Sequence, residues 1–247
     1  MERRRILAWE GCLNIRDLGG YPTAYGVQTR WGAVVRADTV SKLTMAGHAA
    51  LLAYGVRTIV DLRLPHEVEA KPNPYAMPGE HGIAYHHISM IDPAEFPPKD
   101  FTTLADNYKM MLDRYTDRVA SVIHAIAHAS PKGAVLLHCV GGKDRTGIAV
   151  ALLLGAVRVP YDVIAADYAL TAECLRPEWE ETLRHNPERR QEIERELEVM
   201  MPRVEVMLEL LDHLDRRYGG VDPYLRHIGL TDLELELIRA RLLGYVP

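Results

Sequence analysis

Short apolar runs alternate with longer stretches of helical spacing over the first 160 residues. The runs 31–36, 58–62, 83–90 and 134–137 predict β-strands. The last run is continuously apolar, which is typical of a strand buried on both faces of a sheet. Because strands and helices alternate, we expect an α/β domain with a mainly parallel central sheet flanked by helices.

Helices are predicted between and after these strands. Residues 44–54 have helical spacing and end at Gly55, a residue suited to a C-terminal cap. Residues 104–129 read as one long helical stretch, and a strongly apolar helix begins at about Thr146. Residues 92–100 contain three prolines, so we expect a loop there.

The chain reads as helix throughout from Tyr161 onwards. Residues 177–199 are dense in Glu and Arg, which indicates either a solvated helix or a mobile lid over a site. An apolar stripe at helical spacing follows, formed by Val204, Met207, Leu208, Leu211 and Leu214. Gly219 and Gly220 are expected to end that helix, and Thr231 or Asp232 to cap a last one.

Length and composition are those of one globular domain. The chain has 247 residues, of which 48% are apolar and 26% are charged, so disorder and fibrous repeats are excluded. We expect a single domain over residues 1–247, with residues 162–218 as a helical insertion that includes the lid candidate. The net charge of −5 argues against a generic nucleic-acid binder. It leaves an anionic substrate open, because a local positive site can lie on an acidic protein.

The cysteines and the N-terminus favour a cytoplasmic protein. Three cysteines, Cys12, Cys139 and Cys174, fit neither a disulfide framework nor a zinc site, so reduced thiols are expected. The apolar run 6–9 is too short for a signal peptide. The longest apolar run, 148–157, is shorter than the roughly 20 residues that cross a bilayer, so we expect no stable membrane insertion. The sequence leaves the oligomeric state open.

Candidate chemistry concentrates in residues 138–147, H-C-V-G-G-K-D-R-T-G, between a predicted buried strand and an apolar helix. A loop there can turn successive backbone N–H groups inward, and the helix adds the positive end of its dipole. Together they would cradle a dianion such as phosphate. Gly141 and Gly142 permit the unusual backbone angles and close approach that this needs. The expected substrate-binding residues are Val140, Gly141, Gly142, Lys143 and Thr146.

Cys139 and Arg145 are the predicted catalytic residues of this loop. A thiol in that positive field is expected to have a pKa between about 3.5 and 7.5, so Cys139 would be a nucleophilic thiolate. The planar fork of Arg145 can hold two oxygens of the same anion. Thr146 is expected to donate a hydrogen bond to the cysteine sulfur, and His138 to orient the loop. A buried cysteine at a strand end is usually a small hydrophobe, but the surrounding motif makes that reading weak here.

The loop resembles that of the cysteine-dependent protein-tyrosine phosphatase superfamily, whose signature is H-C-x5-R-[ST]. Its form, C-V-G-G-K-D-R-T-G, is similar to the atypical bacterial tyrosine and lipid phosphatases with C-x-x-G-K-D-R-T-G. Other segments also resemble that family: N-I-R-D-L-G-G-Y at 14–21, V-R-A-D at 35–38 for F-R-S-D, V-D-L-R at 60–63 followed by Glu67, D-Y at 167–168 and Y-G-G at 218–220.

The resemblance implies one α/β phosphatase domain that hydrolyses its substrate through a phosphocysteine intermediate, with no metal or other cofactor. It also implies that the partners are phosphorylated proteins or phosphoinositides, with phosphotyrosine as the first substrate and phosphoserine or phosphothreonine as further ones. Lys143 and Asp144 inside the loop depart from ordinary tyrosine phosphatases, and Lys143 adds positive charge at the pocket. It would either bind a second phosphate, as on a phosphoinositide headgroup, or face solvent and tune the field of the loop.

The mechanism needs a general acid to protonate the leaving oxygen, and three aspartates compete for that role. Asp144 ranks first because it lies in the loop beside Arg145. Asp92 ranks second because it begins a proline-rich loop after a strand, as in dual-specificity phosphatases. Asp61 ends a buried strand, but we expect it to form an ion pair with Arg63 or Arg16 instead.

Further charged residues are assigned supporting roles. Arg16, Asp17 and Arg63 are expected to brace the site as one charged network. His86 and His87 are adjacent on a predicted strand, so their side chains point to opposite faces and cannot chelate one metal together.

Two other classes of protein use a similar cradle. A phosphate-binding module without significant turnover would not need both Cys139 and Arg145, which are present. A sulfurtransferase or an arsenate reductase also uses a cysteine anion loop, but such loops do not usually carry this pattern. We therefore expect a phosphatase.

Overall fold

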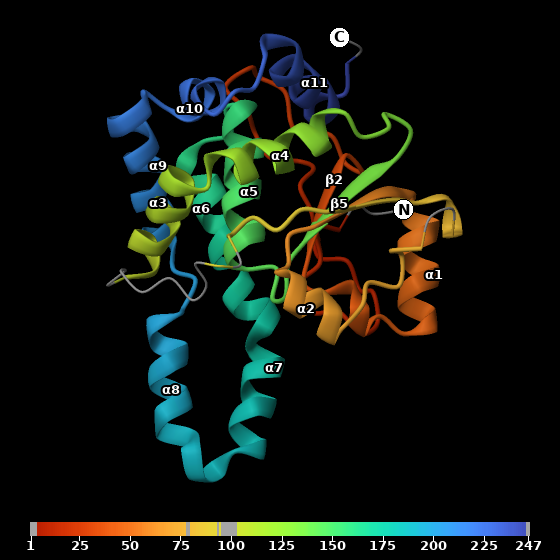
Figure 1. The fold of residues 1–247 in the computed structure, drawn as a ribbon, viewed down its shortest axis with the longest axis vertical. Helices are drawn as coiled ribbons and strands as arrows, with labels where there is room; N and C mark the ends of the chain where they lie inside the picture. Colours follow the sequence, from red (N-terminus) through yellow and green to blue (C-terminus); the bar gives the residue numbers. More distant parts are fainter. Residues whose placement is uncertain (1–3, 78–79, 93, 95–102, 246–247) are drawn as a thin grey trace.

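A five-stranded sheet forms the centre of the computed structural model, which describes residues 4–77, 80–92, 94 and 103–245 (Figure 1). The strands are β1 (Arg16–Asp17), β2 (Val34–Ala37), β3 (Val56–Asp61), β4 (Ala84–His87) and β5 (Ala134–His138). Their order is β1-β2-β5-β3-β4. Only the pair β1–β2 is antiparallel, so the predicted mainly parallel α/β sheet is confirmed.

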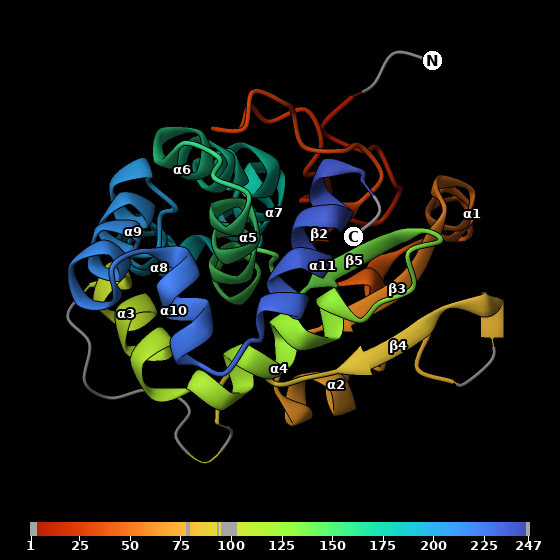
Figure 2. The ribbon, with the colours of Figure 1, turned by 90° about the horizontal axis from the view of Figure 1, so that it is seen from above.

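Both faces of the sheet are covered, as the continuous apolar run of β5 predicted. Successive residues of a strand point to opposite faces. Val135 and Leu137 therefore enter one core, and Ala134 and Leu136 enter another. The first core is the larger one and is built by the helices that surround α5. The second lies under α1, on the other side of the sheet (Figure 2).

Eleven α-helices occur in the described part of the chain. They are α1 (Met45–Tyr54), α2 (Pro65–Ala70), α3 (Leu104–Arg114), α4 (Thr116–Ala127), α5 (Asp144–Ala156), α6 (Tyr161–Ala169), α7 (Thr171–His185), α8 (Arg190–Val199), α9 (Val204–Tyr218), α10 (Val221–His227) and α11 (Asp232–Leu243). Helix α5 is buried along nearly its whole length and carries the C-terminal end of the 138–147 loop.

The predicted capping residues lie where the sequence placed them. Thr44 accepts a hydrogen bond from the Gly47 N–H at the start of α1, and Gly55 ends that helix with a φ of 91°. Thr231 caps α11 in a capping box with Glu234.

Two details of the helical prediction are wrong. Residues 104–129 form two helices rather than one, because the buried Tyr115 leaves the helical conformation, with a φ of −103° and a ψ of 38°. In α9, Leu208 is exposed, and the buried stripe contains Leu210 instead. The observed stripe runs i, i+3, i+4, i+7 from Met207, which is the better match to 3.6 residues per turn.

The 162–218 segment divides into core helices and a projecting hairpin. Helices α6 and α9 supply Ile164, Tyr168, Met207 and Leu211 to the main core. Of the described helices in this segment, α7 and α8 extend away from the body as a helical hairpin (Figure 1). The 162–218 insertion and the motion of the hairpin as a lid both stay predictions.

The remaining expectations concern membranes and the proline-rich loop. No described helix combines the length and apolarity needed to cross a bilayer. Most of the loop expected at 92–100 lies outside the described residues.

Candidate active site

The loop between β5 and α5 is held by hydrogen bonds to four successive carbonyl oxygens. Cys139 lies at its start and is 2% exposed. The donors are the His138 Nδ1 to Cys139 O (3.0 Å), the Thr39 N–H to Val140 O (2.8 Å), the Asn14 Nδ2 to Gly141 O (2.8 Å) and the Arg36 Nη2 to Gly142 O (2.7 Å).

These bonds determine where the backbone N–H groups of the loop point. In a trans peptide the C=O and the following N–H point in opposite directions. Three of the carbonyls are bound from outside the loop and the first by His138, so the N–H groups of the four residues that follow, Val140, Gly141, Gly142 and Lys143, are directed to its inner side. The free N–H groups of the first turn of α5 adjoin them. The loop can therefore cradle an anion.

Only one of the two glycines is required on steric grounds. Gly142 has a φ of +63°, and a Cβ there would lie 2.4 Å from the Ala37 carbonyl oxygen. A Cβ on Gly141 would meet only a Leu175 methyl at 3.7 Å, an ordinary contact. The expectation that both positions need glycine therefore holds for Gly142 alone.

Arg145 is held in a fixed orientation by Glu67 of α2. Its Nη1 and Nη2 donate to Glu67 Oε2 (2.5 Å) and Oε1 (3.0 Å). Burial alone would lower the pKa of Arg145, but the facing Cys139 and Glu67 raise it above its ordinary value, so the guanidinium is charged. Sequence reasoning assigned Glu67 no role. The sequence feature that could have indicated a role for Glu67 is its position shortly after the V-D-L-R segment.

The Thr146 hydroxyl does not bond to the cysteine sulfur, contrary to the prediction. Its Oγ1 is fully buried and has no hydrogen-bond partner among the described residues. A buried unsatisfied hydroxyl in a native fold needs an explanation, and a ligand of the site is one.

His138 orients the loop as expected. Its ring is completely buried, and burial lowers the pKa of His138, which favours the neutral imidazole. The Nδ1–H then donates to the Cys139 carbonyl, and Nε2 accepts from Asn73 Nδ2 at 3.0 Å. Asn73 was missed because nothing in its local sequence marks it.

Asp61 is committed to an ion pair with Arg63, as the sequence suggested. It accepts from Arg63 Nε (2.9 Å) and Nη2 (2.7 Å), and also from Asn73 Nδ2 (3.2 Å) and the Tyr85 hydroxyl (3.0 Å). Burial alone would raise the pKa of Asp61, but the charged Arg63 guanidinium bonded to it holds that pKa well below its usual range. An ionised and fully bonded carboxylate is a poor proton donor.

A buried cluster behind the loop joins β1, β2 and α6. The Asp167 carboxylate accepts from Arg16 Nε (3.2 Å), Arg36 Nη1 (2.5 Å) and the Tyr21 hydroxyl (2.7 Å). Burial would raise the pKa of Asp167, but the two guanidinium groups hold it well below its usual range. Two residues connect this cluster to the loop. Arg36 donates to one loop carbonyl, and Asn14, which accepts from Arg16, donates to another.

The predicted network of Arg16, Asp17 and Arg63 is therefore wrong. Arg16 binds Asp167, and Arg63 binds Asp61. Asp17 follows Arg16 on β1 and points to the other face, where it accepts from the N–H groups of Gly19 and Gly32.

Asp144 and Lys143 form an ion pair at the entrance to α5. Lys143 Nζ donates to Asp144 Oδ1 (2.8 Å) and to the Met200 carbonyl at the end of α8 (2.9 Å). The Tyr108 hydroxyl also donates to Asp144 Oδ1 (2.5 Å) and contacts the Tyr168 hydroxyl. The solvent-facing alternative for Lys143 is wrong, since its side chain is 11% exposed.

The surroundings of the two acid candidates differ. Burial would raise the pKa of Asp144, but the Lys143 ammonium and the Tyr108 hydroxyl hold it below its usual range. Asp92 pairs with Arg118 of α4 (3.4 Å) and accepts from the Ala94 N–H (3.0 Å). Among the described residues, no hydrogen bond or ion pair joins Asp92 to the 138–147 loop.

Known proteins match nearly the whole chain. Residues 7–244 fit the model of the tyrosine phosphatase family. A tyrosine-protein phosphatase of Nostoc commune is 30% identical over an alignment that covers 85% of this chain and 74% of that protein. The triple specificity protein phosphatase PtpB of Mycobacterium tuberculosis is 28% identical over an alignment that covers 95% of this chain and 98% of that protein.

Proposed function

This chain belongs to the tyrosine phosphatase family and is a phosphatase; from that premise we propose that it hydrolyses phosphate monoesters through a phosphocysteine on Cys139. The observation that carries the proposal is the cradle. The four bound carbonyl oxygens direct the N–H groups that follow them to the inner side of the loop, Cys139 is buried at its start, and Glu67 binds Arg145 at its end. The family match also favours this reading over a sulfurtransferase or a binding module.

In the first step, the Cys139 thiolate attacks phosphorus while the ester P–O bond breaks. The electron pair of that bond goes to the leaving oxygen, which takes a proton from a general acid. Negative charge on the three remaining phosphoryl oxygens is stabilised by the loop N–H groups and by the Arg145 fork. These donors are fixed by the surrounding network before the substrate binds.

Asp144 is the better candidate for the general acid. It lies beside Arg145, whereas Asp92 is paired with α4. Because the pKa of Asp144 is lowered in the free enzyme, its carboxylate must take up a proton from solvent when the substrate binds. A phosphate dianion in the cradle would raise the pKa of Asp144, since a like charge nearby disfavours the ionised carboxylate.

In the second step, water attacks phosphorus and the S–P bond breaks, which returns the thiolate. The water proton passes to the Asp144 carboxylate, now acting as base. The unpartnered Thr146 hydroxyl is suited to donate a hydrogen bond to the departing sulfur.

Phosphotyrosine is the substrate class that we rank first. Val140 exposes 42% of its surface on the loop and offers apolar contact to an aromatic ring. Lys143 is bound to Asp144 and Met200, so it could bind a second phosphate only by leaving both. The name of the Mycobacterium tuberculosis relative supports phosphoserine and phosphothreonine as further substrates. Phosphoinositides rank below these, and we keep the cytoplasm as the proposed location.

Phosphate release from a small panel tests the proposal. The panel is p-nitrophenyl phosphate, a phosphotyrosine peptide, a phosphoserine peptide and phosphatidylinositol 3-phosphate, in buffer with EDTA. We expect release by the wild-type enzyme and none by Cys139→Ser. Release that survives Cys139→Ser would overturn the nucleophile assignment. Binding of phosphate esters without release would instead indicate a binding module, and persulfide formation with thiosulfate a sulfurtransferase.

The pH profiles of two variants identify the acid. Asp144→Asn is expected to remove the basic limb of the kcat profile, and Asp92→Asn to retain it. The loss in Asp144→Asn should be larger with phenyl phosphate than with p-nitrophenyl phosphate, because the poorer leaving group needs the proton more. The opposite pattern between the two variants would assign the role to Asp92.

A further inference from the structure

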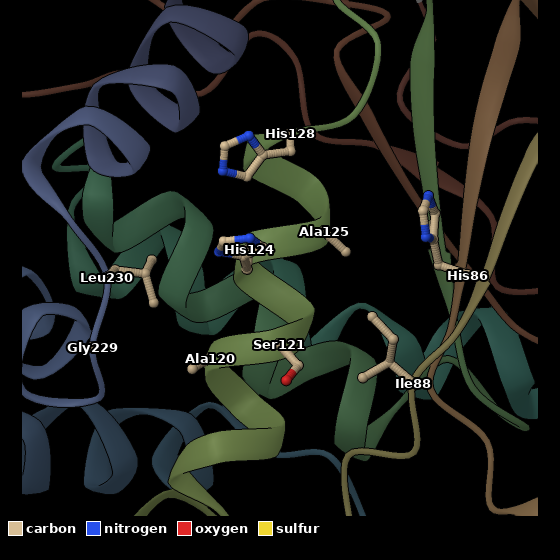
Figure 3. A pocket seen from close by; sticks show the side chains of 9 residues that line it. All are labelled: His86, Ile88, Ala120, Ser121, His124, Ala125, His128, Gly229 and Leu230. Atoms are coloured by element: carbon tan, nitrogen blue, oxygen red, sulfur yellow. The ribbon is translucent and has the colours of Figure 1, made fainter.

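His124 of α4 and His128, the residue that caps the C-terminal end of that helix, face one carboxylate of α11, outside the loop described above. His124 and His128 are four residues apart, so their side chains lie on one side of the helix. Figure 3 shows both imidazole rings projecting from α4 to the side on which Leu230 lies, with His86 on the other side. The third group is Glu234, in the first turn of α11.

The three groups lie close enough to share one ion. One ligand atom from each residue lies within 4.8 Å of the other two. His128 Nε2 is 3.1 Å from Glu234 Oε1, and His124 Nδ1 contacts the same oxygen. Tetrahedral zinc, with bonds of about 2.0–2.2 Å, keeps its ligand atoms roughly 3.4 Å apart. Small side-chain rotations therefore suffice to place an ion between them.

Glu234 is held in place by its own capping box. Its Oε2 accepts from the Thr231 N–H and the Thr231 hydroxyl, both at 2.8 Å, which directs Oε1 to the histidines. The side chain is 6% exposed. The two hydrogen bonds from Thr231 hold the carboxylate through the oxygen that does not face the histidines. Such outer hydrogen bonds orient the carboxylate ligands of metal sites.

We propose that His124, His128 and Glu234 bind one divalent transition-metal ion, with zinc as the best match. Two imidazoles and one carboxylate suit Zn²⁺ better than Mg²⁺ or Ca²⁺, which prefer oxygen ligands. The ion would join α4 to α11 and has no part in the phosphatase reaction.

Access to the site favours an exchangeable ion. The side chains of His124 and His128 are 62% and 49% exposed. Both line a cavity of about 560 Å³, which leaves room for water or a fourth ligand on the ion. The two histidines are at helical spacing in the sequence, but Glu234 is more than 100 residues further along the chain, so the sequence alone does not bring the three together.

Metal titration of the full chain tests the site. Zn²⁺ binding is measured by calorimetry, and Co²⁺ serves as a spectroscopic probe of the coordination geometry. We expect one tight equivalent per chain, weakened by at least about 10- to 100-fold in His124→Gln and in His128→Gln. His86→Gln is the matched control, since His86 lines the same cavity outside the cluster, and it should bind as the wild type does.

Folding and competing sites are controlled in the same experiment. Zn²⁺ should raise the Tm of the wild type and of His86→Gln but not of the two other variants. All variants should keep wild-type phosphatase activity in EDTA, which shows that they are folded. Equal binding by all variants would place the metal elsewhere, for example on the cysteine thiols. That result, or no binding at micromolar Zn²⁺, would overturn the proposal and leave the cluster as a hydrogen-bonded contact between helices.

Discussion

Glu67→Gln tests whether Arg145 works through a fixed orientation. In the wild type, both Glu67 carboxylate oxygens accept from the guanidinium, at 2.5 and 3.0 Å. A glutamine keeps one acceptor oxygen and presents an NH₂ group to the other arm of the fork. If that oxygen takes the place of Oε2, it can still accept the hydrogen bond from the Leu64 N–H, which Glu67 Oε2 accepts at 2.7 Å in the wild type. The substitution therefore disturbs Arg145 more than it disturbs α2.

The size of the effect follows from the loss of one charge-assisted hydrogen bond. Such a bond is worth about 1.5–3 kcal/mol. The two side chains are only 12% and 19% exposed, so solvent screens the pair weakly. If that free energy is lost from transition-state binding, kcat/KM falls by about 10- to 150-fold.

The assay is steady-state hydrolysis of p-nitrophenyl phosphate by Glu67→Gln and by Glu69→Gln. Glu69 is exposed on the same helix, so its variant removes the same charge without touching Arg145. We expect Glu69→Gln to match the wild type. A Glu67→Gln enzyme within about twofold of Glu69→Gln would refute the reasoning, because the orientation of Arg145 would then not limit catalysis.

Three further outcomes are expected. Gly142→Ala should lose at least about 100-fold in kcat/KM, because its Cβ would meet the Ala37 carbonyl, whereas Gly141→Ala should stay within about tenfold; similar losses in both would contradict the steric argument. Asp167→Asn should lower the free energy of unfolding by about 3–5 kcal/mol in urea denaturation, because it leaves two buried guanidinium groups without their counter-charge. The depressed pKa of Asp167 gives a contribution to stability that is present above the unfolded pKa, about 3.9, and is lost as the pH falls below it. The urea midpoint of the wild type should therefore drop between pH 5 and pH 3, and an equal drop in Asp167→Asn would be evidence against this assignment.

Local patterns predicted most of the fold. The strands and the caps at Thr44, Gly55 and Thr231 depend on neighbours a few residues away, and the sequence contains those neighbours. The end of α3 at Tyr115 interrupts a stretch whose apolar residues keep helical spacing, so the hydrophobic periodicity does not predict it. Strand β1 has two residues, too few to show any alternation.

The site could be predicted only as far as it is continuous in sequence. The residues of the loop from His138 to Thr146 are consecutive in sequence and form one recognisable motif, so they could be identified together. The partners that position it come from distant segments, as Glu67 does for Arg145 and Tyr108 for Asp144. Charge alone also placed Asp17 in the wrong network. Asp17 and Arg16 are adjacent on β1, so their side chains point to opposite faces of the sheet and bind different partners.

Trapping the covalent intermediate tests the central claim most directly. The enzyme is quenched with acid during turnover of p-nitrophenyl phosphate, and its peptides are analysed by mass spectrometry. We predict one phosphoryl group on Cys139 in the wild type and none in Cys139→Ser. A phosphoryl group on another residue, or turnover through an enzyme whose Cys139 is never phosphorylated, would contradict the account.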